Sequence, residues 1–226
     1  MNQVTDQQII EILRKEAVPA LGCTEPVACA LACAKCKEVL GGVPERLDVL
    51  VSGNIYKNGM GVGIPGTGMV GLPIAAALGA VCGKSEYGLE VLKEVNVGDN
   101  LQRAKDMLDQ VTVSLKEDAP DKLYAEALAT KGNDTVKVVI AHTHTNIVLV
   151  EKNGEEIFKR EFRLDTSKPE DKGPELSVKR IWDFVHEVDV KDIEFVLQGA
   201  EMNKAISAEG LNSEYGLQIG LSLIHI

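Results

Sequence analysis

Residues 20–26 read Ala20-Leu21-Gly22-Cys23-Thr24-Glu25-Pro26, and this stretch is predicted to open a helix. Thr24 is suited to the N-cap, Glu25 to the positive end of the helix dipole, and Pro26 to the first turn. A thiol just before such a helix has its thiolate stabilised. Cys23 is therefore a candidate nucleophile, base or metal ligand. The alternative is a buried structural cysteine at a tight turn.

Helices are predicted on both sides of this stretch. Thr5 and Gln8 form a capping box at the start of a helix that ends near residue 18, before Pro19. The helix that begins in the stretch continues to residue 40 and ends at Gly41-Gly42. The remaining elements predicted in this part are a short strand over 47–51 and helices over 72–81, 87–94 and 99–108.

The hydrophobic period changes after residue 110. Apolar residues alternate over 111–162, which predicts a meander of antiparallel strands, and Asn153-Gly154 is a strong signal for a hairpin turn. A polar linker over 167–175 is followed by two predicted helices, over 178–188 and 191–208.

These elements predict an α+β fold, in which a helical portion carries the site, an antiparallel meander follows, and C-terminal helices close the structure. The predicted portions are 1–110 (helical, glycine-rich, with the substrate site), 111–166 (sheet) and 167–220 (linker and packing helices). Residues 221–226 form an apolar end without a cap, which we interpret as a non-native tail. The small-residue helices suit close contact within one subunit or across a homodimer.

The composition argues against several classes of function. The chain has 226 residues, 45% of them hydrophobic and 26% charged, with a net charge of −10. This balance, without a basic patch, argues against nucleic-acid binding. No signal peptide and no apolar run of about 20 residues is evident, so we expect no membrane segment. The five cysteines then predict a reducing, cytoplasmic location.

Three further cysteines share one stripe of the predicted helix. Cys29, Cys33 and Cys36 have the spacing of an iron–sulfur motif, but such a motif needs a loop that lets the thiolates converge. At positions i, i+4 and i+7 of a helix they are expected to pack as small apolar side chains.

The segment 61–71 contains two overlapping G-x-G-x-x-G matches. A dinucleotide site needs this motif between a strand and a helix, and no strand is predicted directly before either match. A better-supported use is a nest of backbone N–H groups at Gly66, Thr67 and Gly68, ahead of a helix, that holds a carboxylate or phosphate. The alternative is a loop that only lets helix and sheet approach closely.

His142 and His144 fall on a predicted strand with one residue between them, so they are expected on the same face. Two histidines without a carboxylate cluster are too few for a metal site, so no metal ligand is assigned in this chain. His144 and Asn146 are candidate hydrogen-bonding residues for a substrate.

Four segments together resemble the bacterial and archaeal L-cysteine desulfidases, a family related to the alpha chain of iron–sulfur L-serine dehydratases, many of whose relatives are named only as an uncharacterised protein family. The segments are Ala20–Pro26, Lys57-Asn58-Gly59, Ile64–Gly79 and His144–Val148, and the resemblance extends from Val4 to Gly220.

This resemblance implies a lyase that converts L-cysteine to sulfide, ammonia and pyruvate with a [4Fe–4S] cluster and without pyridoxal phosphate. Cys23 matches the family's N-terminal cysteine, proposed as the base or as a group beside the substrate. The substrate carboxylate is expected in the Gly66–Gly68 nest, assisted by Lys57 or Asn58, with His144 and Asn146 as further candidates.

The family's three cluster cysteines lie in a C-terminal half that has no counterpart here, and Cys29, Cys33, Cys36 and Cys82 do not match them. We therefore expect a fragment that holds no cluster alone and is itself inactive. Deamination of L-serine and a non-catalytic small-molecule-binding module are the alternatives. A further alternative is that this chain pairs with a separately encoded partner that carries the three cysteines.

Overall fold

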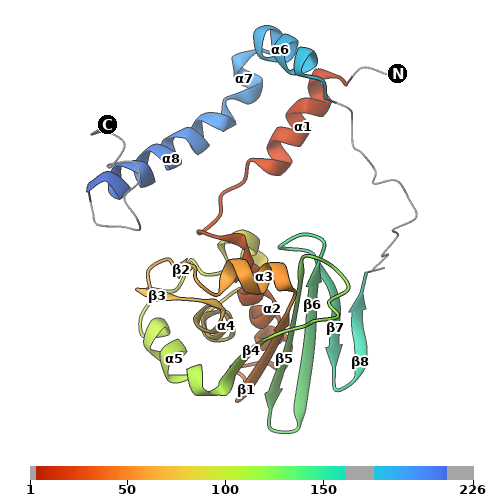
Figure 1. Ribbon diagram of the computed structural model, residues 1–226, viewed down its shortest axis with the longest axis vertical. Helices are drawn as coiled ribbons and strands as arrows, with labels where there is room; N and C mark the ends of the chain where they lie inside the picture. Colours follow the sequence, from red (N-terminus) through yellow and green to blue (C-terminus); the bar gives the residue numbers. More distant parts are fainter. Residues whose placement is uncertain (1–3, 161–175, 213–226) are drawn as a thin grey trace. The chain divides into compact units, whose positions relative to one another are not determined.

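The computed structural model describes residues 4–160 and 176–212, and the chain divides into two compact units (Figure 1). The helical unit comprises Met1–Pro19 and Ser167–Ile226, and the sheet unit comprises Ala20–Thr166. Helices and a mostly antiparallel sheet confirm the predicted α+β class. The units do not follow the predicted portions, because a strand from the first of these portions, β1 (Arg46–Val51), lies inside the sheet.

The sheet has six strands in the order β4-β1-β5-β6-β7-β8. The predicted meander is found in its second part, where β5 (Tyr124–Lys131), β6 (Asp134–Ala141), β7 (Ile147–Lys152) and β8 (Glu155–Lys159) pair antiparallel. The strand β4 (Val111–Leu115) does not belong to this meander, because it pairs parallel with β1. The Asn153-Gly154 hairpin is confirmed, and the φ values of 53° and 84° are those of a tight two-residue turn.

Two helices built from small residues cover the sheet. The α2 helix (Thr24–Leu40) contacts β5 and β6, and the α4 helix (Leu72–Val81) packs against α2 (Figure 1). The approach is close, since a Cβ atom at Gly79 would lie 2.2 Å from the carbonyl oxygen of Ala30. The small side chains therefore serve a helix contact within one subunit.

Shorter elements connect these layers. Residues 52–71 form a glycine-rich stretch that contains α3 (Gly53–Gly59) and a hairpin of β2 (Gly63–Ile64) and β3 (Met69–Val70), none of which the sequence predicts. The helix predicted over 87–94 is a 3₁₀ segment, η1 (Ser85–Glu90), because Gly88 has a φ of 53° and interrupts it. The helix predicted over 99–108 is shorter, as α5 (Asn100–Asp106), with η2 (Leu108–Gln110) after it.

The helical unit contains α1 (Asp6–Glu16), α6 (Val178–Glu187), α7 (Val190–Ile193) and α8 (Phe195–Asn212). The capping box is confirmed, since the Thr5 hydroxyl accepts the N–H of Gln8 and the Gln8 side chain accepts the N–H of Thr5 at 2.9 Å. The core of this unit consists of Val4, Ile9, Ile10 and Phe184.

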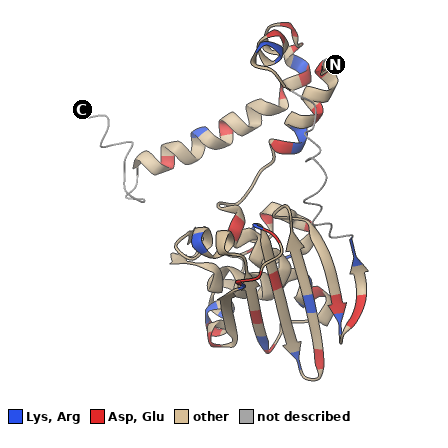
Figure 2. Ribbon diagram, turned by 45° about the vertical axis from the view of Figure 1, so that its right-hand side comes forward, with Lys and Arg blue, Asp and Glu red and all other residues tan. Residues whose placement is uncertain are grey.

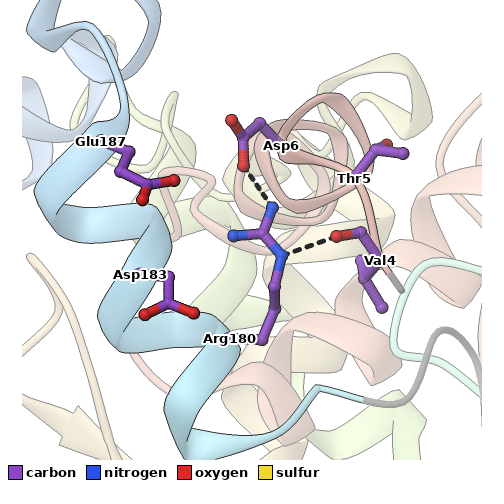
Figure 3. A pocket seen from close by; sticks show the side chains of 6 residues that line it. All are labelled: Val4, Thr5, Asp6, Arg180, Asp183 and Glu187. Carbon is purple, nitrogen blue, oxygen red and sulfur yellow. Dashed lines mark hydrogen bonds and ion pairs between the residues drawn. The ribbon is translucent and has the colours of Figure 1, made fainter.

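Arg180 connects α6 to the start of α1. Its Nε donates to the carbonyl oxygen of Val4 at 2.6 Å, and its guanidinium pairs with the Asp6 carboxylate (Figure 3). The predicted linker over 167–175 and the predicted tail over 221–226 lie outside the described residues. None of the helices in the described ranges is long and apolar enough to cross a membrane.

Candidate functional site

Cys23 occupies the N-cap of α2, where Thr24 was predicted. The sharp turn before it is made by Gly22, whose φ is +82°. The Cys23 side chain does not cap the helix. Its thiol instead donates to the Oε2 atom of Glu25, with a distance of 2.8 Å between sulfur and oxygen. The thiol is half-buried and is held by a carboxylate that follows two residues later.

Glu25 receives contacts from two other side chains. Asn58, on α3, donates from Nδ2 to Oε1 at 3.1 Å, and the Thr24 hydroxyl lies 3.5 Å from Oε2. The hydrogen bond from Cys23 is the largest influence on Glu25 and lowers the pKa of its carboxyl, while burial acts in the opposite direction. Glu25 is therefore a carboxylate at neutral pH.

The charge state of Cys23 differs from the sequence-based expectation. Burial, followed by the hydrogen bond to Glu25, raises the pKa of the Cys23 thiol above its ordinary value. The backbone N–H groups at the start of α2 lower the pKa, as the helix dipole predicts, but they are outweighed. Cys23 is therefore a thiol at neutral pH, and the prediction of a stabilised thiolate is wrong.

The charge of Glu25 also acts on His144, which lies in another part of the chain. The strand on which it was predicted, β6, ends at Ala141, and His142 follows with a φ of 70°. The two histidines therefore do not share a strand face, and the Nδ1 of His142 pairs with Asp121 at 2.7 Å. His144 is half-buried, burial lowers the pKa of its imidazole, and the charge of Glu25 opposes this shift.

Asn146 shapes the turn that carries His144. Its Nδ2 donates to the carbonyl oxygen of Ala141 at 2.9 Å, and its Oδ1 accepts from Arg160 at 2.5 Å. Both ends of the amide are thus used within this part of the sheet unit. The geometry supports a structural contribution from Asn146, whereas the sequence suggested contact with a substrate.

The Gly66–Gly68 segment lies in the β2–β3 hairpin ahead of α4, and β3 stands between them because α4 begins after Gly71. The buried Thr67 hydroxyl donates to the carbonyl oxygen of Ile64 at 2.7 Å and accepts the N–H of Met69 at 2.9 Å. Gly68, with a φ of +65°, faces open space. The Thr67 hydroxyl is thus used in hydrogen bonds within the hairpin, and an anion-binding nest at Gly66–Gly68 stays a prediction.

The hairpin nevertheless meets the start of α2. A Cβ atom on Gly22 would lie 3.0 Å from Cγ of Pro65, so the turn before Cys23 packs directly on the loop before Gly66. Lys57 is exposed on α3, next to Asn58. The structure therefore brings segments 20–26, 57–59 and 64–71 into contact with one another. His144, in the fourth segment, interacts with Glu25 through its charge.

The cysteine stripe of α2 faces the sheet. Cys29, Cys33 and Cys36 are fully buried, and the Cys36 Sγ atom lies 3.5 Å from the carbonyl oxygen of Ala127. Burial raises the pKa of Cys29 to about 12. These neutral thiols pack as small apolar groups, as the stripe predicted. Within the described ranges, no group of three or more histidine, cysteine or acidic residues is placed to hold a metal ion.

Glu25 is the residue whose importance the sequence analysis missed. The sequence indicates only a favourable place on the helix dipole, yet Glu25 accepts hydrogen bonds from Cys23 and Asn58, and its charge acts on His144. Its position two residues after Cys23 carried the signal. With Cys23 at the N-cap, Glu25 falls in the first turn, where its carboxylate can reach back to the N-cap side chain.

Relatives of the chain were found by sequence comparison. A protein of Parabacteroides distasonis is 46% identical over 222 residues, covering 96% of this chain and 51% of that protein. A protein of Dichelobacter nodosus is 46% identical over 224 residues, covering 98% of this chain and 51% of its own length. Both are UPF0597 proteins. A UPF0597 protein of Phocaeicola vulgatus is 43% identical over 216 residues, covering 95% of this chain and 50% of that protein.

The chain thus spans about half the length of the UPF0597 proteins it matches. Their names state no activity and mention neither cysteine desulfidase nor serine dehydratase. No family model matches the sequence, and no solved structure matches it.

Proposed function

We propose that the chain forms the amino-acid-binding part of a lyase that eliminates sulfide from L-cysteine, with sulfide, ammonia and pyruvate as products. The observation that carries the proposal is the contact of Glu25 with both Cys23 and Asn58, at the turn that packs on Pro65. The charge of Glu25 also acts on His144, so the proposal assigns a proton donor, a proton acceptor and an anion-binding loop to this part of the sheet unit, as an α,β-elimination needs.

Each part of L-cysteine has a partner in this site. Lys57 and the exposed loop at Gly68 are assigned to the substrate carboxylate, since Lys57 is an exposed cation next to Asn58 and Gly68 faces open space. His144 is assigned to the Cα proton, because an imidazole with a lowered pKa is neutral and able to accept a proton near pH 7. Cys23 stands beside the substrate as a thiol.

These groups account for each bond that forms or breaks in the elimination. His144 takes the Cα proton, the Cα–Cβ double bond forms, and the Cβ–S bond breaks with its electron pair on sulfur. The aminoacrylate that results gains a proton at Cβ and hydrolyses to pyruvate and ammonia.

The resemblance to desulfidases also implies a [4Fe–4S] cluster, and the residues described do not fit one. The thiols of Cys29, Cys33 and Cys36 are buried along a single helix face and do not converge. We therefore derive no step through a cluster, and the proposal covers only substrate binding and proton transfer. All five cysteines are free thiols, which supports the proposed cytoplasmic location.

The test uses the full-length Parabacteroides distasonis relative under anaerobic conditions. With L-cysteine, we expect sulfide and pyruvate in equal amounts, and replacement of the cysteine that aligns with Cys23 by alanine should lower the rate by about a hundredfold or more. Pyruvate from L-serine, with no sulfide from L-cysteine, would favour the serine dehydratase alternative. If neither amino acid reacts, the lyase proposal is wrong.

A non-catalytic small-molecule-binding module is the second candidate. It predicts that the chain binds L-cysteine in a calorimetric titration while the longer relative releases no product from it.

A further inference from the structure

The carboxylate of Glu25 is held in place from two elements. Asn58 donates to Oε1 from α3, and Cys23 donates to Oε2 from the N-cap of α2. The backbone N–H of Glu25 itself also stabilises the charge at this helix terminus. Because both carboxylate oxygens have partners, the acceptor of the Cys23 proton has a fixed position.

This arrangement differs from the usual setting of a reactive cysteine. A thiolate at a helix N-terminus is stabilised by backbone N–H groups, and in many enzymes by a nearby cation as well. Here the nearest charge is negative, at 2.8 Å from the sulfur. A negative charge at this distance disfavours the thiolate, and the carboxylate accepts a hydrogen bond that only the thiol can donate.

The other titratable groups around this pair do not reverse that effect. His144 lies in the turn after β6, where the charge of Glu25 acts on it, and burial lowers the pKa of its imidazole so that it is neutral at pH 7. Lys57 is exposed on α3, beside the Asn58 that contacts Glu25. Glu25 is the one side-chain charge that acts on Cys23 in the described part of the chain, together with the backbone at the start of α2.

We propose that Glu25 is a positioning residue that holds Cys23 as a hydrogen-bonded thiol, so that Cys23 serves the reaction as a proton donor and not as the base. This inference rests on the proposed function and deepens it. After the elimination, the Cys23 S–H bond breaks and its proton forms the new C–H bond at Cβ of the aminoacrylate. The electron pair stays on sulfur, and the resulting thiolate beside Glu25 regains a proton from water.

The test measures the proton on Cys23 directly, in the 226-residue chain and without substrate. The rate of alkylation by iodoacetamide is followed from pH 7 to pH 10, and peptide mapping by mass spectrometry counts only the Cys23 product. In Glu25→Gln the amide keeps its size and loses its charge. We expect the pH midpoint of alkylation to fall by about one unit.

The rate at pH 8 should then rise about threefold. The thiolate fraction rises about tenfold, and the lower intrinsic nucleophilicity of a more acidic thiol offsets part of this gain. In Glu25→Asp the charge is kept, so its midpoint should stay nearer to that of the unmodified chain. Glu117→Gln removes an equal charge from an exposed site in the same unit and should leave the midpoint unchanged.

If the Gln variant has the midpoint of the unmodified chain, Glu25 does not hold the proton and the inference is wrong. The same conclusion follows if Glu25→Asp and Glu25→Gln shift the midpoint equally, since the effect would then come from packing and not from charge. Failure of the proposed function has a different signature, because alkylation requires no turnover. An inactive relative leaves the predicted midpoint shift in place.

Discussion

The contact between α2 and α4 leaves no room for a side chain at Gly79. A Cβ atom there would lie 2.2, 2.7 and 2.8 Å from the O, Cα and C atoms of Ala30. All three are backbone atoms of a buried helix, so no side-chain rotation relieves the overlap. The Gly79→Ala substitution must therefore push α4 away from α2 or distort one of the two helices.

The cost can be bounded from two opposing effects. Overpacking a core costs about 1–3 kcal/mol, and the overlap with rigid backbone places Gly79→Ala at or above the upper end of that range. The better helix propensity of alanine returns about 1 kcal/mol. We expect a net loss of about 2 kcal/mol in the free energy of unfolding, which corresponds to about 4–8 °C in Tm for a chain of this size.

The assay is urea unfolding followed by far-UV circular dichroism, with hydrogen exchange to locate the change in α2 and α4. Gly199→Ala is the matched control, because Gly199 lies in α8 and an added Cβ meets nothing within 4 Å. That variant should be as stable as the unmodified chain or slightly more so. A Gly79→Ala variant as stable as the unmodified chain would refute the close helix contact.

Three other predictions concern single side chains. Arg180→Met removes the hydrogen bond to Val4 and the ion pair with Asp6, and should destabilise the attachment of α1 by about 2 kcal/mol. Hydrogen exchange in α1 should then be faster, and an unchanged exchange rate would contradict the contribution of Arg180. His144 has a folded-state pKa below its ordinary 6.5, so its unfolded form binds the proton more strongly and stability falls as the pH drops below 6.5. The His144→Gln variant should lose this contribution, so its urea midpoint should fall less between pH 7 and pH 5 than that of the unmodified chain. An equal fall in both proteins would contradict the burial of the ring. Cys23→Ala should leave the Tm within about 2 °C, because the thiol is half-buried and does not cap α2, and a larger loss would make Cys23 a structural residue.

Local signals predicted the elements that depend on neighbouring residues. The capping box of Thr5 and Gln8 and the turn at Asn153-Gly154 are set by contacts within a few residues, and both are present. The pairing of β4 was not predictable in this way. Alternation of Val111 and Val113 is the same in a parallel and an antiparallel strand, and the choice depends on β1, more than 60 residues earlier in the chain.

In the site, too, local sequence predicts some residues but not the contacts between distant parts of the chain. The sequence indicates Cys23, Asn58 and His144, but not that a single carboxylate binds the first two and acts on the third through its charge. The Asn58–Glu25 contact joins residues 33 positions apart. The direction of the Cys23 pKa depended on which residue took the N-cap and on burial, and neither is determined by the local pattern. His142 and His144 do not lie on one strand face, because His142 adopts a left-handed φ where β6 has ended.

The central claim is that the four segments form one site for an amino acid. The most direct test is a crystal structure of the chain soaked with L-cysteine. We expect the amino acid to bind between Cys23 and His144, with its carboxylate toward Lys57 and Gly68 and its thiol carbon within reach of the Cys23 sulfur. If the amino acid binds elsewhere on the chain, or does not bind at this site at saturating concentration, the four segments do not form its site.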